Sequence, residues 1–366
     1  MASSWGKHLK ISIWGESHSE SIGVVVDGLP AGESIDWNQL LQFMGRRRSS
    51  GGATDTARVE ADLPEIQSGL LNNVTCGTPI CALIRNTNTR SKDYSLFERV
   101  ARPGHADYSG YLRYDGHNDI RGGGHFSGRL TAPLCFAGAI AKQILARKGI
   151  SICAHIQQVG SICERRFSTD DFSADLVQRL NTSFFPTLEE NTSQSMQDCI
   201  AAARAEGNSV GGAIECAVLG VPGGYGDPLF DSVESQLASL LFSIPAVKGV
   251  EFGSGFELAA MYGSESNDAF AVRNGSIVTE SNHNGGILGG ITTGMPIVFR
   301  CAFKPTPSIS LPQKSVDFIS KEEVTLNICG RHDPCIVRRA VPVVEAAAAL
   351  VVLDLLLSSD KHWKQH

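Results

Sequence analysis

Three glycine-rich segments concentrate the side chains of this sequence that can carry out chemistry. The first is Gly15–His18, which ends in an adjacent serine and histidine. The second, residues 102–107, reads R-P-G-H-A-D and leads to three glycines at 122–124, and the third, residues 330–335, reads G-R-H-D-P-C. Loops and strand–helix junctions present most functional groups on a rigid scaffold, so we expect these segments to line a site.

The residue types in these segments favour an anionic substrate. Guanidinium groups bind phosphate and carboxylate through paired hydrogen bonds, and imidazole gives or takes a proton near neutral pH. A further cluster of cations, Arg46–Arg48, can neutralise an anion in the same way. The combination indicates a site in which a negatively charged leaving group is neutralised.

Each feature also has an ordinary structural explanation. A single loop histidine is usually a surface or capping residue, and Gly122–Gly124 can be a flexible turn. Asp333 precedes a proline and can start a turn, and the arginine triplet can be a solvated helix end. Three histidine-containing glycine loops in one chain make these explanations weaker together than singly.

Other chemistries fit the sequence less well. Ser17, His18 and Asp333 offer the residue types of a hydrolase, but Ser17 is not in a G-x-S-x-G elbow and adjacent side chains project differently. The sequence contains no H-E-x-x-H, no H-x-H and no G-x-x-x-x-G-K-[ST]. We therefore expect no metal.

Composition indicates a compact soluble protein. Of 366 residues, 42% are apolar and 19% charged, and the net charge of −6 gives no general attraction to nucleic acid or membrane. No two of the ten cysteines have C-x-x-C spacing, and Met1–Lys7 lacks an apolar signal core, so we expect free thiols and a cytoplasmic location. The longest apolar run, Val341–Leu357, contains Glu345 and Asp354, which favours a buried helix over a membrane span.

The order of expected elements favours an α+β sandwich with mostly antiparallel sheets. Asp36 is a good N-cap for a helix that ends in the arginine triplet, and residues 86–130 form a long polar stretch typical of a functional site. No linker divides the chain, so we expect a single domain over residues 1–366. The other expected elements are strands within 10–29, 58–85, 211–221 and 285–304 and helices at 131–148, 193–205, 231–241 and 343–357.

Taken together, the motifs resemble those of the chorismate synthase family. The three segments match that family's signatures, the second extending over residues 124–139 and the third to Pro342 and Glu345–Ala346. Shorter matches occur between them, in order, over roughly residues 6 to 357. They are Asn86–Thr87, residues 90–94, Ala246–Glu251, Asn282–His283, Gly285–Gly290 and Lys304–Thr306.

The resemblance implies a carbon–oxygen lyase acting on a phosphate ester. Such an enzyme converts 5-enolpyruvylshikimate 3-phosphate to chorismate and phosphate by anti-1,4-elimination, the last common step of the shikimate pathway towards aromatic amino acids. It requires reduced FMN without net redox change. The family fold is a β-α-β sandwich, with central helices between mostly antiparallel sheets, and the usual assembly is a homotetramer. NADPH can be the reductant, and we expect an external flavin reductase.

The resemblance also assigns roles by position. His18 would protonate reduced flavin, His105 would assist the departing phosphate, and Asp333 would help to remove the ring proton. Ser17 and Ser127 would position substrate and relay protons. The predicted FMN contacts are His125, Phe126, Ser127, Ala246, Gly289, Lys304, Pro305, Thr306, Pro307, Ser308 and Arg331, and the residues predicted to bind substrate or NADP phosphate are Arg47, Arg48 and Arg129.

One segment departs from the family pattern. The family usually reads R-S-S-A-R-E-T where residues 125–131 read H-F-S-G-R-L-T, so His125 would replace an arginine only when protonated. All proposed catalytic positions are kept. Two other readings stay open: a non-catalytic flavin- or phosphoester-binding protein, and an unrelated phosphatase-like hydrolase that needs no flavin.

Overall fold

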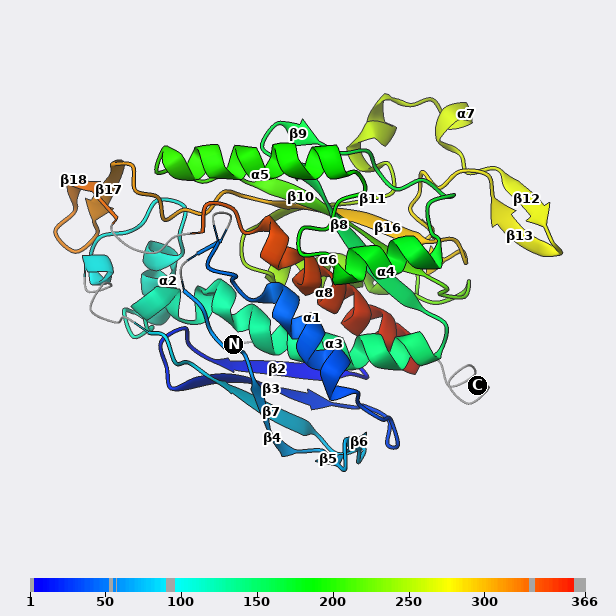
Figure 1. The fold of residues 1–366 in the computed structure, drawn as a ribbon, viewed down its shortest axis with the longest axis horizontal. Helices are drawn as coiled ribbons and strands as arrows, with labels where there is room; N and C mark the ends of the chain where they lie inside the picture. Colours follow the sequence, from blue (N-terminus) through cyan, green and yellow to red (C-terminus); the bar gives the residue numbers. More distant parts are fainter. Residues whose placement is uncertain (1–2, 53–54, 57, 90–95, 329–332, 359–366) are drawn as a thin grey trace.

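Two antiparallel sheets enclose a layer of helices (Figure 1). The computed structural model describes residues 3–52, 55–56, 58–89, 96–328 and 333–358. The sheet–helix–sheet arrangement confirms the predicted α+β sandwich with central helices.

The first sheet has the strand order β1-β2-β3-β7-β4. Its centre is the hairpin of β2 and β3, paired in register from Lys10 opposite Asp27 to Gly15 opposite Ile22. Alternate β3 residues Ile22, Val24 and Val26 are buried, as expected for a strand with one face on the core. The strands are β1 (Ser4–Trp5), β2 (Lys10–Gly15), β3 (Ser21–Asp27), β7 (Ile80–Arg85) and β4 (Pro64–Ser68).

The second sheet has the order β11-β16-β10-β8-β9 and is also antiparallel. Helix α5 (Glu190–Ala205) lies over its outer face, and α4 (Ala174–Thr182) packs against β8 (Figure 1). The strands are β11 (Val247–Phe252), β16 (Ile297–Phe303), β10 (Gly212–Leu219), β8 (Ser151–Val159) and β9 (Ile162–Cys163).

The central layer contains α1 (Trp37–Arg47), α3 (Thr131–Arg147), α6 (Val233–Ser243) and α8 (Val337–Ser358). Helix α8 is apolar on all sides because α1, α3, α6, β8 and β10 surround it. Among the described residues it is the one helix long and apolar enough to cross a membrane, and it is almost entirely buried within the protein. This confirms the prediction of a buried helix. Helices α3 and α8 approach so closely at Gly138 that any larger side chain would overlap Ala346.

Smaller elements lie at the edges. The hairpin of β12 (Phe270–Arg273) and β13 (Ser276–Thr279) projects from the body, and that of β17 (Gln313–Asp317) and β18 (Glu322–Leu326) lies at the opposite end (Figure 1). The remaining short elements are β5 (Leu70–Leu71), β6 (Val74–Thr75), β14 (Ile287–Leu288), β15 (Ile291–Thr292), α2 (Asp107–Tyr114), α7 (Gly263–Ser266), and the 3-10 turns η2 (Arg121–Phe126), η3 (Gly128–Leu130), η4 (Leu229–Asp231) and η5 (Gly255–Ala260).

The two ends of the described chain are tied together. The carboxylate of Asp354, in α8, accepts hydrogen bonds from the backbone N–H groups of His8 at 2.7 Å and Leu9 at 2.6 Å. This contact joins the last helix to the start of the first sheet. It supports the proposal that residues 1–366 form one domain.

Most sequence predictions of elements agree with the structure, but three helix starts were wrong, including that of α5, which begins at Glu190 instead of Ser193. The Asp36 side chain caps α1 as predicted, accepting from the N–H groups of Asn38 and Gln39. Helix α6 is capped by Ser232 instead of Asp231, and α8 begins at Val337 instead of Val343. The error in α8 arises because Pro342, which usually marks a helix boundary, lies inside α8.

Candidate active site

A cavity of about 700 Å³ opens beside the C-terminal end of α1 and the N-terminal end of α8. Among the described residues, eight cationic side chains and three carboxylates line it, although the whole chain has a net charge of −6. This local excess of positive charge concentrates an anionic ligand. The cations are Arg47, Arg48, Arg58, Arg102, Arg129, Lys248, Lys304 and Arg339, and the carboxylates are Glu60, Asp62 and Asp333.

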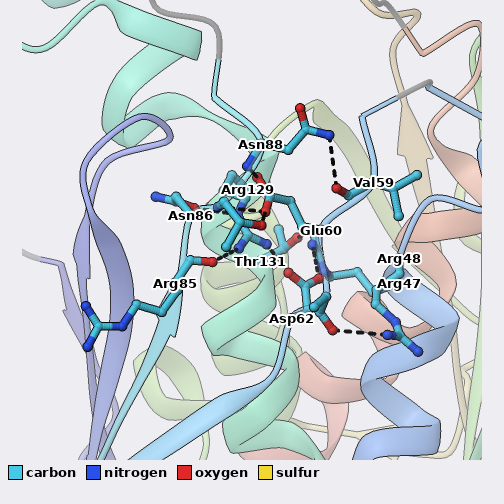
Figure 2. A network of polar contacts seen from close by, with 12 residues as sticks. Arg47, Arg48, Val59, Glu60, Asp62, Arg85, Asn86, Asn88, Arg129 and Thr131 are labelled. Carbon is cyan, nitrogen blue, oxygen red and sulfur yellow. Dashed lines mark hydrogen bonds and ion pairs between the residues drawn. The ribbon is translucent and has the colours of Figure 1, made fainter.

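One wall consists of two buried arginines that share a carboxylate (Figure 2). Arg47, from the last turn of α1, donates to Asp62 at 2.5 Å, and Arg129, from η3, donates to the other oxygen of Asp62. Burial opposes ionisation of Asp62, but the two guanidinium groups outweigh it and lower its pKa to about 2. Two positive charges therefore face one negative charge, and the wall keeps a net positive charge. Arg48, the C-cap of α1, donates to the carbonyl of Ala61.

A second polar network orients Ser17. Arg58 donates from Nη1 to the Ser17 hydroxyl at 3.0 Å and from Nη2 to the Ser17 carbonyl at 3.2 Å. Glu60 holds Arg58 at 2.8 Å and accepts from the N–H and hydroxyl of Thr87. Arg58 is thus fixed between Glu60 and the serine.

His18 lies behind the three-glycine turn. Gly122 lines the cavity with φ of +63°, and a Cβ at Gly122 would lie 2.7 Å from Ser17 Oγ and 2.9 Å from His18 Nδ1. Ser17 and His18 are buried and adjoin the cavity through Gly122 and Arg58. Burial first, and then the charge of Arg58, lower the pKa of His18 to about 4, so its imidazole is neutral at pH 7 in the free protein.

His105 lies on the other side of the same turn, in the loop before α2. A Cβ at Gly123 would come within 3.0 Å of His105 Nε2, and His105 itself lines the cavity. The other ring nitrogen, Nδ1, is 2.7 Å from the carboxylate of Asp107. Arg102 pairs with the same carboxylate, with a shortest distance of 2.7 Å.

Asp333 and Ser127 complete the predicted catalytic group. Asp333 precedes α8, and its carboxylate accepts from the N–H of Thr56 at 2.9 Å and from Arg339 Nη1 at 2.8 Å. The Ser127 hydroxyl accepts from the N–H of Arg129 at 3.2 Å and so caps η3. Both residues line the cavity.

The predicted FMN contacts only partly gather here. His125 lines the cavity, but its Nδ1 is 2.8 Å from the Gly15 carbonyl and its Nε2 is 3.0 Å from the Ser3 hydroxyl, so both ring nitrogens are engaged. Phe126, Ser127, Ala246, Lys304, Thr306, Pro307 and Ser308 line the cavity, whereas Pro305 does not. Gly289 lies in the exposed turn between β14 and β15, away from this wall. Arg331 lies outside the described residues.

Several cavity residues were missed from the sequence as site residues. Arg58, Glu60 and Asp62 form an alternating charged pattern, R-x-E-x-D, which places all three on one side of an extended segment. That pattern was a usable signal. No sequence pattern marked Arg339 as a site residue, because it lies in the first turn of a helix whose start the sequence did not reveal.

The fold and cavity define a class of protein: an α+β sandwich enzyme whose site gathers imidazole, carboxylate and guanidinium groups around one cavity. The chain matches the chorismate synthase family over residues 9–357, and it belongs to that family.

Similar proteins cover almost the whole chain. It is 46% identical over 352 residues to the chorismate synthase of Pyrococcus abyssi (strain GE5 / Orsay), covering 96% of this chain and 97% of the relative. It is 45% identical over 357 residues to that of Dehalococcoides mccartyi (strain ATCC BAA-2266 / KCTC 15142 / 195), covering 98% and 97%. A crystal structure of chorismate synthase superposes with a TM-score of 0.75 at 27% identity, covering 97% of this chain and 93% of the other.

Proposed function

We propose that this protein converts 5-enolpyruvylshikimate 3-phosphate to chorismate and phosphate with the help of reduced FMN. The observation that carries the proposal is that His105 and Asp333 line one cation-rich cavity, with His18 buried directly behind Gly122 of its wall, in a member of this family. The substrate is a polyanion, and FMN adds a phosphate. Opposite charges 4 Å apart attract by about 4 kcal/mol at an effective dielectric constant near 20, so the excess of cations favours both ligands.

The cavity also has a wall that fits a flavin ring. Apolar side chains line part of the cavity, and the cavity volume lies within the usual range for small-molecule sites. Ala246, at the start of β11, has φ of +74°, an unfavourable conformation for alanine that exposes its backbone at the cavity edge. The apolar residues of this wall are Phe242, Ile244, Pro245, Ala246, Val247, Ile336, Ala340 and Val343. With Phe126, Ser127, Lys304 and residues 306–308, they would hold the cofactor.

The reaction breaks the carbon–oxygen bond to phosphate and one ring C–H bond, and phosphate leaves with the electron pair. The cofactor held by these residues would supply transient electron density for cleavage of that bond and a nearby base for the ring proton. Arg47, Arg48 and Arg129 bind the substrate phosphate and carboxylates and keep the leaving group neutralised. His105 lines the cavity, with Nε2 beside Gly123, and assists the departing phosphate.

His18 is neutral in the free protein because its pKa is about 4. Nearby anionic ligands favour the protonated imidazole, so ligand binding raises the pKa of His18 and lets it hold a proton beside the flavin. Asp333, held by Arg339 and the Thr56 N–H, helps to remove the ring proton. Ser17 and Ser127 position the substrate and relay protons.

An anaerobic assay tests the proposal. Phosphate release and chorismate absorbance are followed from the enolpyruvyl ester with and without dithionite-reduced FMN. Equimolar products only with reduced FMN support the proposal. FMN binding without turnover indicates a binding protein, and phosphate release from simple esters without flavin indicates a hydrolase.

The reducing system is a separate part of the proposal. We propose that NADPH is the electron source and that an external flavin reductase transfers its electrons to FMN. Anaerobic assays with NADPH and FMN alone, and then with an added reductase, test it. Chorismate formation with NADPH and FMN alone would contradict the need for a reductase.

We also propose a cytoplasmic homotetramer. Large apolar side chains are exposed in and near the projecting β12–β13 hairpin: Phe256, Tyr262, Phe270, Val272 and Ile277. Such exposed apolar surface usually marks an interface. The nine described cysteines are all free, as expected in a reducing compartment. Light scattering gives the mass of the assembly, and a monomer at micromolar concentration would contradict it.

A further inference from the structure

The carboxylate of Asp107 joins two cavity residues. Arg102 donates from Nε to Oδ2 at 2.8 Å, from Nη2 to Oδ1 at 2.7 Å and from its backbone N–H to Oδ2 at 2.9 Å. His105 Nδ1 lies 2.7 Å from Oδ1. Asp107 is buried at the start of α2, and it is absent from the cavity wall, so it reaches the site only through Arg102 and His105.

The crowding at Oδ1 determines which nitrogen of His105 carries the proton. Two lone pairs 2.7 Å apart would repel each other, so a hydrogen must lie between Nδ1 and Oδ1, and an ionised carboxylate has none to give. Arg102 Nη2 is also 3.1 Å from Nδ1, but a hydrogen bond from it would leave the closer contact of 2.7 Å between Nδ1 and Oδ1 without a hydrogen. Nδ1 is therefore the donor, and in the neutral ring Nε2 is the acceptor.

Asp107 stays ionised as this arrangement requires. Its burial opposes ionisation, but hydrogen bonds first from Arg102 and then from His105 hold its pKa far below the usual range. The Arg102 guanidinium in turn stacks 4.4 Å from the centre of the Phe97 ring, which fixes the carboxylate from behind.

We propose that Asp107 is a positioning residue that fixes His105 in the Nδ1–H form, with Nε2 directed at the leaving group. The proposal rests on the proposed function for its kinetic consequence, but not for the proton position itself. A protonated His105 then donates from Nε2 and, once it has given up that proton, returns to one defined tautomer. A carboxylate that orients a catalytic imidazole through the opposite ring nitrogen acts in the same way in other enzymes.

The proton position is measured directly by NMR of protein labelled with ¹⁵N-histidine, with His105→Gln used to assign the signals. In the full-length protein above pH 8, we expect the Nδ1–H tautomer for His105, although free imidazole side chains favour Nε2–H. In Asp107→Asn, the Nδ1–H preference is lost. A neutral His105 with its proton on Nε2 in the native protein would overturn the proposal. This measurement needs neither substrate nor turnover.

Kinetics test the consequence. We expect Asp107→Asn to lower kcat by about 10- to 100-fold with KM changed much less, because substrate binding does not involve Asp107. In a His105→Ala background, Asp107→Asn should change kcat much less than in the native protein, because Asp107 then reaches the site only through Arg102. Equal losses in both backgrounds would overturn the proposal.

Asp171→Asn is the matched control. Asp171 also accepts two guanidinium hydrogen bonds, from Arg165, and one backbone N–H, from Ser168, but no histidine. The Asp171→Asn variant should leave kcat unchanged. Reduced-FMN binding and thermal unfolding, measured for every variant, separate loss of folding from loss of orientation. If the wild type makes no chorismate, the proposed function fails while the NMR result still decides the proton position.

Discussion

His18 and His105 lie on opposite sides of one glycine turn but in opposite electrostatic surroundings. Gly122 faces the ring of His18, and Gly123 faces that of His105. Burial, and then the guanidinium of Arg58, lower the pKa of His18, whereas an ionised carboxylate, Asp107, contacts His105. Groups of one type whose surroundings differ in this way usually have different proton-transfer roles. His18 is therefore neutral until anionic ligands bind, whereas His105 has a negative charge beside it.

Removal of each imidazole gives the largest expected effect. We expect His105→Ala to lower kcat by about 10²- to 10⁴-fold, the usual contribution of a proton donor, and His18→Ala by at least about tenfold. Stopped-flow or steady-state measurement of chorismate absorbance with dithionite-reduced FMN checks the rates of both variants. Unchanged rates in both variants would refute the assigned roles.

The glycine turn allows each histidine to be disturbed separately. Gly123 has φ of +85°, and an alanine methyl there would lie 3.0 Å from His105 Nε2. We expect Gly123→Ala to lower kcat by about 10- to 100-fold because it displaces the imidazole of His105. Gly122→Ala should also lower kcat, because it displaces His18 and Ser17.

Gly149→Ala is a control for backbone strain alone. Gly149 has a similar φ of +76° but no atom within 4 Å of the added methyl. It should cost about 1–2 kcal/mol in stability and leave kcat unchanged. If Gly149→Ala lowered kcat as much as Gly123→Ala, strain and not histidine placement would explain the loss.

Removal of the charge beside His18 should reduce the contrast between the histidines. The pKa of His18 is lowered to about 4 by burial and then by Arg58, with Asp119 opposing and Arg121 assisting. Arg58→Gln should raise this pKa towards 6.5 without restoring it fully, because burial remains. An NMR titration of His18 gives the value, and an unchanged pKa would show that burial alone sets it.

The smallest expected effect is on the pH dependence of stability. Because the pKa of His18 is about 4 in the folded protein and near 6.5 when unfolded, the unfolded chain binds more protons between these values. The contribution of His18 to stability is therefore complete above pH 6.5 and falls as the pH drops towards 4. Arg58→Gln should make this decrease in stability with falling pH smaller, by a fraction of the slope that about one extra bound proton gives. Denaturant unfolding at pH 4.5, 5.5 and 6.5 measures this pH dependence. A steeper decrease in stability for Arg58→Gln than for the native protein would contradict the assigned influence of Arg58 on His18.

The sequence predicted the elements whose signals are local. Alternating apolar residues in β2 and β3 and the Asp36 cap of α1 depend on neighbours in the chain, so they were found. The sequence did not predict the start of α8, because packing against α3 and the second sheet stabilises a helix that continues through Pro342. Local propensity does not contain that tertiary contribution.

The same difference holds for the site. Individual histidines and the arginine triplet were visible as residue types, whereas the sharing of Asp62 by Arg47 and Arg129 joins residues far apart in sequence. The engagement of both ring nitrogens of His125 by Ser3 and Gly15 is another long-range contact that spacing does not reveal.

The contact of Asp354 with the backbone of His8 and Leu9 has a consequence for biosynthesis. It joins residues separated by up to 346 positions, so the first strands leave the ribosome long before their partner exists. Helices α1 and α3 and strands β8 and β10, which pack on α8, have apolar faces uncovered until translation of α8 is complete, and folding on the ribosome therefore cannot reach the native state. Chaperones that shield exposed apolar strands are expected to associate with the growing polypeptide throughout that interval.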